Sequence, residues 1–144
     1  MSSKTEKKVE AIFILEIIGT PKEHLVTTLE DIIKKISEEK GVEIISQKIH
    51  EPNELKDKKD FFTTYAEIEV TVEELLILAK LMFKYMPAHI DVLYPENISL
   101  TNNGFADVLN ELTRRLHGYE EMARIFQFEK KRFENKIKEL EEKK

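Results

Sequence analysis

Along the first hundred residues, the spacing of apolar positions switches between a period of two, typical of β-strands, and a period near 3.6, typical of helices. The first predicted strand is apolar on both faces, with Phe13 and Leu15 on one side and Ile12 and Ile14 on the other, which indicates a central place in a sheet. The predicted strands cover residues 9–18, 42–49, 60–70 and 90–94.

Two helices are predicted between these strands. Each helix is predicted to begin at a Thr that has a Glu three residues later, which is the signature of a capping box. The two pairs are Thr20 with Glu23 and Thr71 with Glu74. The apolar stripe of the first helix is Leu25, Leu29, Ile32, Ile33 and Ile36, and that of the second is Leu75, Leu78, Ala79, Met82 and Met86. The resulting order, βαββαβ, predicts an α+β ferredoxin-like fold in which both helices cover one face of a four-stranded antiparallel sheet.

The opposite face of this sheet has no predicted cover. Its candidate binding residues are Ile12, Ile14, Thr63 and Tyr65. RNA-binding sheets carry stacking aromatic side chains in such positions, so RNA binding is one alternative function. Residues 1–100 hold 13 Lys/Arg and 19 Asp/Glu, however, and an acidic body argues against nucleic acid as the partner.

Two stretches of this region resemble a known family. The residues Gly19-Thr20-Pro21, then Leu25, then 41–46 (GVEIIS) resemble the first loop, helix and second strand of ACT-type ligand-sensing domains. Residues 67–75 (EIEVTVEEL) resemble that family's third strand and second helix, so the resemblance spans 9–95. The resemblance implies a ferredoxin-like fold and a binding site for a small molecule such as an amino acid. It also implies that the ligand would bind at the loop Gly19, Thr20, Pro21, Lys22 and Glu23, where Lys22 stands in place of the family's usual Gly.

After Asn102-Asn103-Gly104, the apolar spacing becomes a heptad repeat that continues to the end of the chain. The repeat predicts a helix long enough to extend beyond its own domain, with residues 103–117 packing on that domain and 119–144 reaching a partner. The predicted interface residues are Leu109, Leu112, Leu116, Tyr119, Met122, Phe126, Phe133, Ile137 and Leu140. Two positions interrupt the pattern: Gly118 weakens the helix, and Lys130 places a charge among the apolar positions.

Charges beside the repeat bear on the orientation of a helical partner. In parallel helices, Arg115 would attract Glu120 and Lys136 would attract Glu141, whereas Glu129 and Glu134 would repel. A parallel pair of two copies is therefore not clearly favoured, and the orientation of the helices stays open. The predicted organisation is a polar N-terminus (1–8), the α+β domain (9–100) and the heptad-bearing helix (101–144).

Composition narrows the chemistry available to the chain. It has 144 residues, 35% of them charged, and neither Cys nor Trp, which rules out disulfides, zinc–thiolate sites and thiol nucleophiles. The abundance of Lys and Glu resembles the bias of hyperthermophile proteins. The polar start lacks a secretory signal, and the longest apolar stretch is too short to cross a bilayer, so we expect a cytoplasmic protein with no membrane partner.

Motifs for catalysis are missing from the sequence. It contains no phosphate-binding loop, serine elbow or dinucleotide glycine pattern, so no enzyme activity and no cofactor are predicted. Two pairs have spacings that suit a shared metal ion, namely His89 with Asp91 and His117 with Glu121. Both are better explained as ordinary polar side chains at the protein surface. No metal site is predicted.

These observations favour a non-enzymatic interaction module that assembles through its C-terminal helix, either with a second copy or with a helix of another protein. The alternative is an ACT-like sensor of a small molecule such as an amino acid. The second alternative is RNA binding through the open sheet face.

Overall fold

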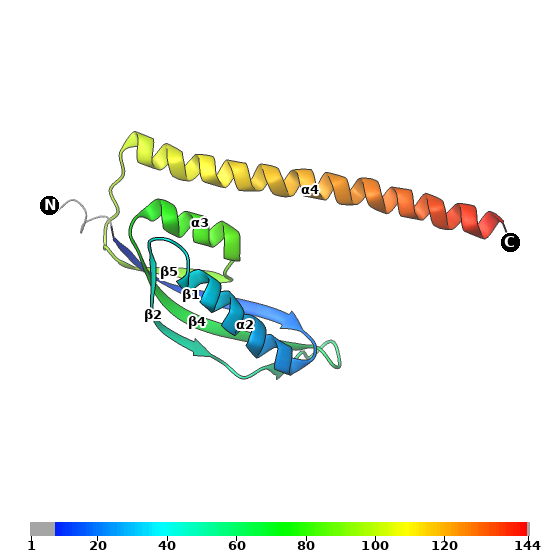
Figure 1. Ribbon diagram of the computed structural model, residues 1–144, viewed down its shortest axis with the longest axis horizontal. Helices are drawn as coiled ribbons and strands as arrows, with labels where there is room; N and C mark the ends of the chain where they lie inside the picture. The colour runs from blue at the N-terminus through cyan, green and yellow to red at the C-terminus, as the bar shows by residue number, and fades with distance from the viewer. Residues whose placement is uncertain (1–7, 144) are drawn as a thin grey trace. The chain divides into compact units, whose positions relative to one another are not determined.

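The computed structural model describes residues 8–143 (Figure 1). Its elements are β1 (Val9–Gly19), α2 (Lys22–Ser37), β2 (Val42–Ile49), β3 (Asn53–Glu54), β4 (Phe62–Val72), α3 (Leu75–Tyr85), β5 (His89–Tyr94) and α4 (Asn102–Glu142). The predicted βαββαβ order and the long C-terminal helix are confirmed.

All neighbouring strands of the sheet are antiparallel, in the order β2-β4-β1-β5. The central strands β1 and β4 pair along their whole length, from Val9 opposite Val72 to Gly19 opposite Phe62. The two-residue strand β3 pairs with the start of β4. Sequence analysis missed β3, because two residues inside a polar loop are too few to show an alternating pattern.

The core lies between one face of the sheet and the two helices α2 and α3. From the sheet, Phe13, Ile68 and Val70 are fully buried, and they share a cluster with the apolar residues of both helices. The helical members of this cluster are Leu29, Ile33, Ile36, Leu78 and Leu81. Both helices therefore cover the same face, as the strand alternation predicted.

The two predicted capping boxes do not form. The helix α2 begins one residue later than predicted, so Pro21, which has no polar side chain, occupies the N-cap. The strand β4 continues through Thr71 to Val72, because Val72 is buried and pairs with both Val9 and Val42. The N-cap of α3 is consequently Glu74, and its side chain makes no capping hydrogen bond.

The C-terminus of α3 differs from the prediction in one residue. Met86 was expected in the core, yet it is 67% exposed. It adopts a left-handed backbone conformation, with φ 48° and ψ 60°, and its N–H donates to the carbonyl of Met82. This geometry ends the helix directly before Pro87 and turns the Met86 side chain away from the core.

The chain divides into two compact units, one ending at Val108 and the other beginning at Leu109. The division falls within α4, a single helix of 41 residues. Gly118 does not interrupt this helix, which is continuous through it. Apart from its chain neighbours and the helix's own backbone, no atom lies within 4 Å of the place where its Cβ would be.

Candidate functional site

The helix α4 starts at a defined cap and continues with its apolar residues in solvent. The Thr101 hydroxyl accepts a hydrogen bond from the Gly104 N–H at 3.0 Å, and the Thr101 carbonyl accepts from the Phe105 N–H at 2.9 Å. A Thr in this role satisfies N–H groups that the first helical turn leaves without partners. Sequence analysis placed the break here but did not identify Thr101 as the cap.

An apolar stripe follows the heptad positions of α4. We call this stripe the seam, and it consists of Leu109, Leu112, Leu116, Tyr119, Ala123, Phe126, Lys130, Phe133, Ile137 and Leu140. Phe126 is 59% exposed and Phe133 is 65% exposed. Leu112 is half-buried, and the predicted interface residue Met122, which flanks the seam, is also exposed. Exposed apolar side chains gathered in this way make the seam the candidate interaction surface of the chain.

Ion pairs along α4 lie mostly within the helix itself. Glu111 accepts from the Arg114 guanidinium at 2.6 and 2.7 Å and from Arg115 at 3.4 Å. Hydrogen bonds from Arg114 and then Arg115 lower the pKa of the Glu111 carboxyl, against the opposing effect of its burial. Arg124 similarly donates to Glu120 at 2.6 Å. Such pairs support a helix at i, i+3 and i, i+4 spacing.

The open sheet face brings together the four residues predicted for it. Ile12 lies opposite Glu69, and Ile14 lies opposite Glu67, so all four residues are on one side of β1 and β4. Ile12, Ile14, Thr63 and Tyr65 are all half-buried.

This face also holds a contact that sequence analysis missed. The imidazole of His50 stacks on the Tyr65 ring, with ring centroids 4.0 Å apart and planes at 19°. The His50 Nε2 atom lies 3.5 Å from a carboxylate oxygen of Glu67. The strand pairing places His50 there, since its N–H donates to the Tyr65 carbonyl. An irregularity in the β2–β4 pairing near Ile45 shifts the register, and no sequence signal marked it.

Carboxylates dominate the open sheet face. The strand pairing places one lysine, Lys48, on this face opposite Glu67. The acidic side chains that share the face are Glu10, Glu16, Glu43, Glu67, Glu69 and Asp91. A surface with this charge repels phosphate groups, so it does not favour a nucleic acid as ligand.

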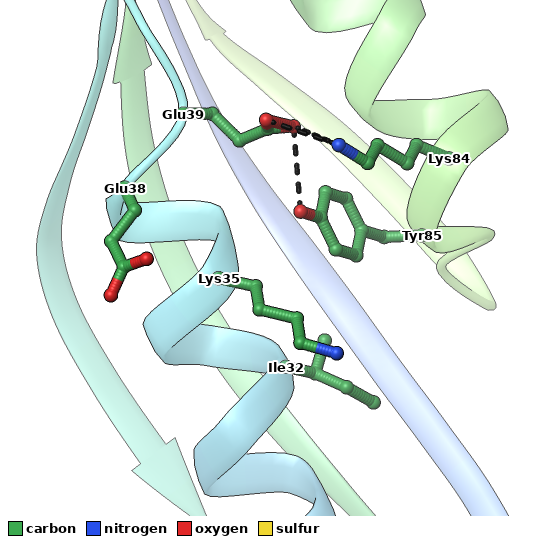
Figure 2. A pocket seen from close by; sticks show the side chains of 6 residues that line it. All are labelled: Ile32, Lys35, Glu38, Glu39, Lys84 and Tyr85. Carbon is green, nitrogen blue, oxygen red and sulfur yellow. Dashed lines mark hydrogen bonds and ion pairs between the residues drawn. The ribbon is translucent and has the colours of Figure 1, made fainter.

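The loop that the ACT resemblance implied as a ligand site is largely open to solvent. Thr20, Pro21, Lys22 and Glu23 are exposed and Gly19 is half-buried. A hollow of about 600 Å³ lies elsewhere, near the C-terminal ends of α2 and α3 (Figure 2). It is lined by Ile32, Lys35, Glu38, Glu39, Lys84 and Tyr85, and it includes none of the loop residues.

The polar side chains of this hollow bind one another. The Lys84 ammonium donates to both carboxylate oxygens of Glu39 at 3.1 and 3.2 Å, and the Tyr85 hydroxyl donates to Glu39 at 3.4 Å (Figure 2). Burial, followed by the charge of Glu39, raises the pKa of the Tyr85 phenol. Ligand pockets are usually lined mainly by apolar groups. This charged hollow is better explained as a link that fastens α3 to the end of α2.

The two histidine pairs singled out from the sequence do form. His89 Nε2 lies 3.1 Å from Asp91 Oδ1, and His117 Nε2 lies 3.2 Å from Glu121 Oε1. Each stays a pair of exposed side chains. Within residues 8–143, no three His, Asp or Glu side chains are grouped closely enough to hold a metal ion.

The fold defines the chain as an α+β protein of the ferredoxin-like class. The MJ0538 family matches residues 10–144, and the chain belongs to that family. Among solved structures, 30S ribosomal protein S6 from Thermotoga maritima is similar to this chain at 17% sequence identity and a TM-score of 0.37. That similarity covers 61% of this chain and 86% of the ribosomal protein. A comparison with curated protein sequences found no match.

Across the described part of the chain, no helix is both long enough and apolar enough to cross a membrane.

Proposed function

We propose that this protein is a non-enzymatic interaction module that assembles with a protein partner through the seam of α4. The observation that supports the proposal is the exposure of the seam, including Phe126 and Phe133, along a continuous helix. Burying apolar surface contributes about 25 cal/mol per Å², so covering such a stripe is a strong driving force for association. The α+β unit would serve as the body that the helix brings to its partner.

The regular heptad spacing supports a helix as the partner. Apolar side chains that alternate by three and four residues fit between the side chains of a second helix in the same arrangement. A flat protein surface would not require this spacing to persist from Leu109 to Leu140.

The experiment compares two double variants of the full chain by light scattering. Phe126→Ser with Phe133→Ser removes two seam aromatics, while Ile125→Ser with Phe128→Ser removes two exposed apolar side chains outside the seam. We expect the parent and the second variant to be oligomeric and the first to be monomeric. Circular dichroism and thermal melting check that the α+β unit of each variant stays folded.

Two results would count against assembly of copies through the seam. A monomeric parent would show that the seam does not bring copies together, and the proposed partner would then have to be a foreign helix. Equal loss of mass in both variants would show that contact surrounds the helix rather than following the seam.

The two alternative functions have less support and stay predictions. Amino-acid sensing would need the loop from Gly19 to Glu23, which the hollow of Figure 2 does not include. RNA binding would need the open sheet face, whose carboxylates oppose it.

A further inference from the structure

The charges that flank the seam carry information about the partner, given the proposed assembly. In a heptad written abcdefg, the seam alternates between positions a and d, and positions e and g lie on its two sides. The a positions are Leu109, Leu116, Ala123, Lys130 and Ile137, and the d positions are Leu112, Tyr119, Phe126, Phe133 and Leu140. The e side is Thr113, Glu120, Gln127, Glu134 and Glu141, and the g side is Arg115, Met122, Glu129, Lys136 and Lys143.

The e side contains no cation, which argues against antiparallel pairing of two copies. In an antiparallel pair of helices, e positions face e positions, and g positions face g positions. Any alignment would therefore bring the carboxylates of Glu120, Glu134 and Glu141 towards other carboxylates or towards the uncharged Thr113 and Gln127. Opposed like charges destabilise a helix pair, and nothing on the e side offsets them.

Parallel pairing places each g residue beside the e residue five positions further on in the second copy. Arg115 then meets Glu120, and Lys136 meets Glu141, which gives two attractive contacts on each side of the pair. Arg115 is held by Glu111 at 3.4 Å, less closely than Arg114 at 2.6 and 2.7 Å. Glu120 also accepts from Arg124 of its own helix at 2.6 Å, so the contact between copies would add to pairs within each helix.

Lys130 and the repulsive contact between Glu129 and Glu134 fall at the same level of a parallel pair, and they compensate each other. The repulsive contact of a parallel pair is Glu129 with Glu134 of the second copy, and Lys130 is the charged residue at position a between them. A side chain at position a packs beside the preceding g residue of the other helix, so Lys130 lies next to Glu129 of the second copy. On each side of the pair, Lys130 of one copy thus lies beside Glu129 of the second copy and one helical turn from Glu134 of its own helix, the two carboxylates that repel.

We propose that the partner of α4 is a second copy of this chain, parallel and in register, with Lys130 of each copy paired to the Glu129 carboxylate of the other. This inference rests on the proposed function and specifies it. A single Lys at position a lowers the stability of a two-stranded coiled coil but selects its register and number of strands. Shifting one helix by a heptad would leave both Lys130 side chains among apolar residues.

The absence of cysteine from the chain gives a direct test of orientation. In Ala123→Cys, the new thiols of a parallel, in-register pair face each other at position a, within the roughly 4–7 Å Cα separation that a disulfide spans. In an antiparallel pair, position a faces position d, so residue 123 never faces its own copy. Asn135→Cys, on the exposed outer side of the helix, is the matched control.

Mild oxidation of both full-length variants is followed by non-reducing electrophoresis, with light scattering of the reduced proteins. We expect both to have the mass of two copies and Ala123→Cys to cross-link several-fold faster than Asn135→Cys. A mass of two copies with no preference for position 123 would overturn the parallel register while leaving assembly intact. A mass of three or more copies would overturn the two-stranded pairing. A monomer would overturn the pairing of two copies and would leave a foreign helix as the partner required by the proposed function.

A charge reversal tests the role of Lys130 separately. Lys130→Glu places only carboxylates at this level of the pair, and we expect it to dissociate the dimer at concentrations where the parent is fully paired. Lys131→Glu makes the same change of charge on the adjacent outer position, and we expect no change of mass. Equal behaviour of the two variants would remove Lys130 from the interface.

Discussion

The two units of this protein differ in whether they bury their regularly spaced apolar side chains. In the α+β unit, Phe13 is completely buried between the sheet and its helices, whereas Phe133 in the helical unit is 65% exposed. Both residues follow a regular apolar pattern, of period two in β1 and of alternating three and four in α4. A pattern predicts that a face will be buried, but only the tertiary structure shows whether the chain itself buries it.

The largest expected effect is a loss of stability when a buried aromatic ring is removed from the α+β unit. Phe13→Ala removes a ring from a packed core, and we expect the free energy of unfolding of the α+β unit to fall by about 3–5 kcal/mol. Phe133→Ala should leave that free energy nearly unchanged and weaken assembly instead. Urea unfolding of both variants at the same protein concentration measures the difference, and similar losses of stability would show that Phe133 is part of a folded core.

A second prediction concerns Gly41, in the turn directly before β2. Gly41 has φ +79°, and a Cβ there would lie 2.6 Å from Ile77 Cδ1. Gly41→Ala should therefore destabilise the α+β unit by about 1–2 kcal/mol from the backbone conformation alone, with the steric contact adding to it. A midpoint in urea equal to that of the parent would show that the turn tolerates the side chain.

The third prediction concerns Gly118 in the helical unit, where replacing glycine with alanine should raise stability rather than lower it. Gly118 is helical, and no other group lies within 4 Å of its potential Cβ, so Gly118→Ala should favour the helix by about 1 kcal/mol. Position 118 also lies outside the seam, so the proposed pairing accepts the methyl group. Thermal melting followed by circular dichroism should give a higher midpoint, and a lower midpoint would indicate that this part of α4 bends in solution.

The smallest expected effect is a pH dependence that belongs to the helical unit. The pKa of Glu111 is lowered in the folded protein by hydrogen bonds from Arg114 and Arg115. A lowered folded-state pKa contributes stability above the ordinary carboxyl range, and this contribution is lost as the pH falls through the folded value. We expect Glu111→Gln to reduce the acid-induced loss of ellipticity at 222 nm, and Glu139→Gln to leave it as in the parent.

Much of the α+β unit was predictable because its signals are local and mutually consistent. The alternation in β1 and β4 identified the buried face, and the order of elements defined the fold. The helix starts were less predictable. Thr71 carries a capping signature, but pairing of the adjacent Val72 with two neighbouring strands stabilises extended structure there.

The candidate surfaces were predictable to different degrees. The seam of α4 is visible in the sequence, since every contact it needs lies three or four residues away along one helix. The stacking of His50 on Tyr65 was not, because it depends on the register of β2 against β4. Position along the chain places these two residues 15 apart, and only the strand pairing brings the rings together.

The place of Tyr119 on the seam allows association to be followed by fluorescence. The chain lacks tryptophan, and its four tyrosines are Tyr65, Tyr85 and Tyr94 in the α+β unit and Tyr119 on the seam. Tyr119→Trp would therefore give the protein a single indole fluorophore at the surface through which we propose that it associates. The emission maximum of that indole would shift towards the blue on assembly and back on dilution, so an affinity could be read from untagged protein in a cuvette.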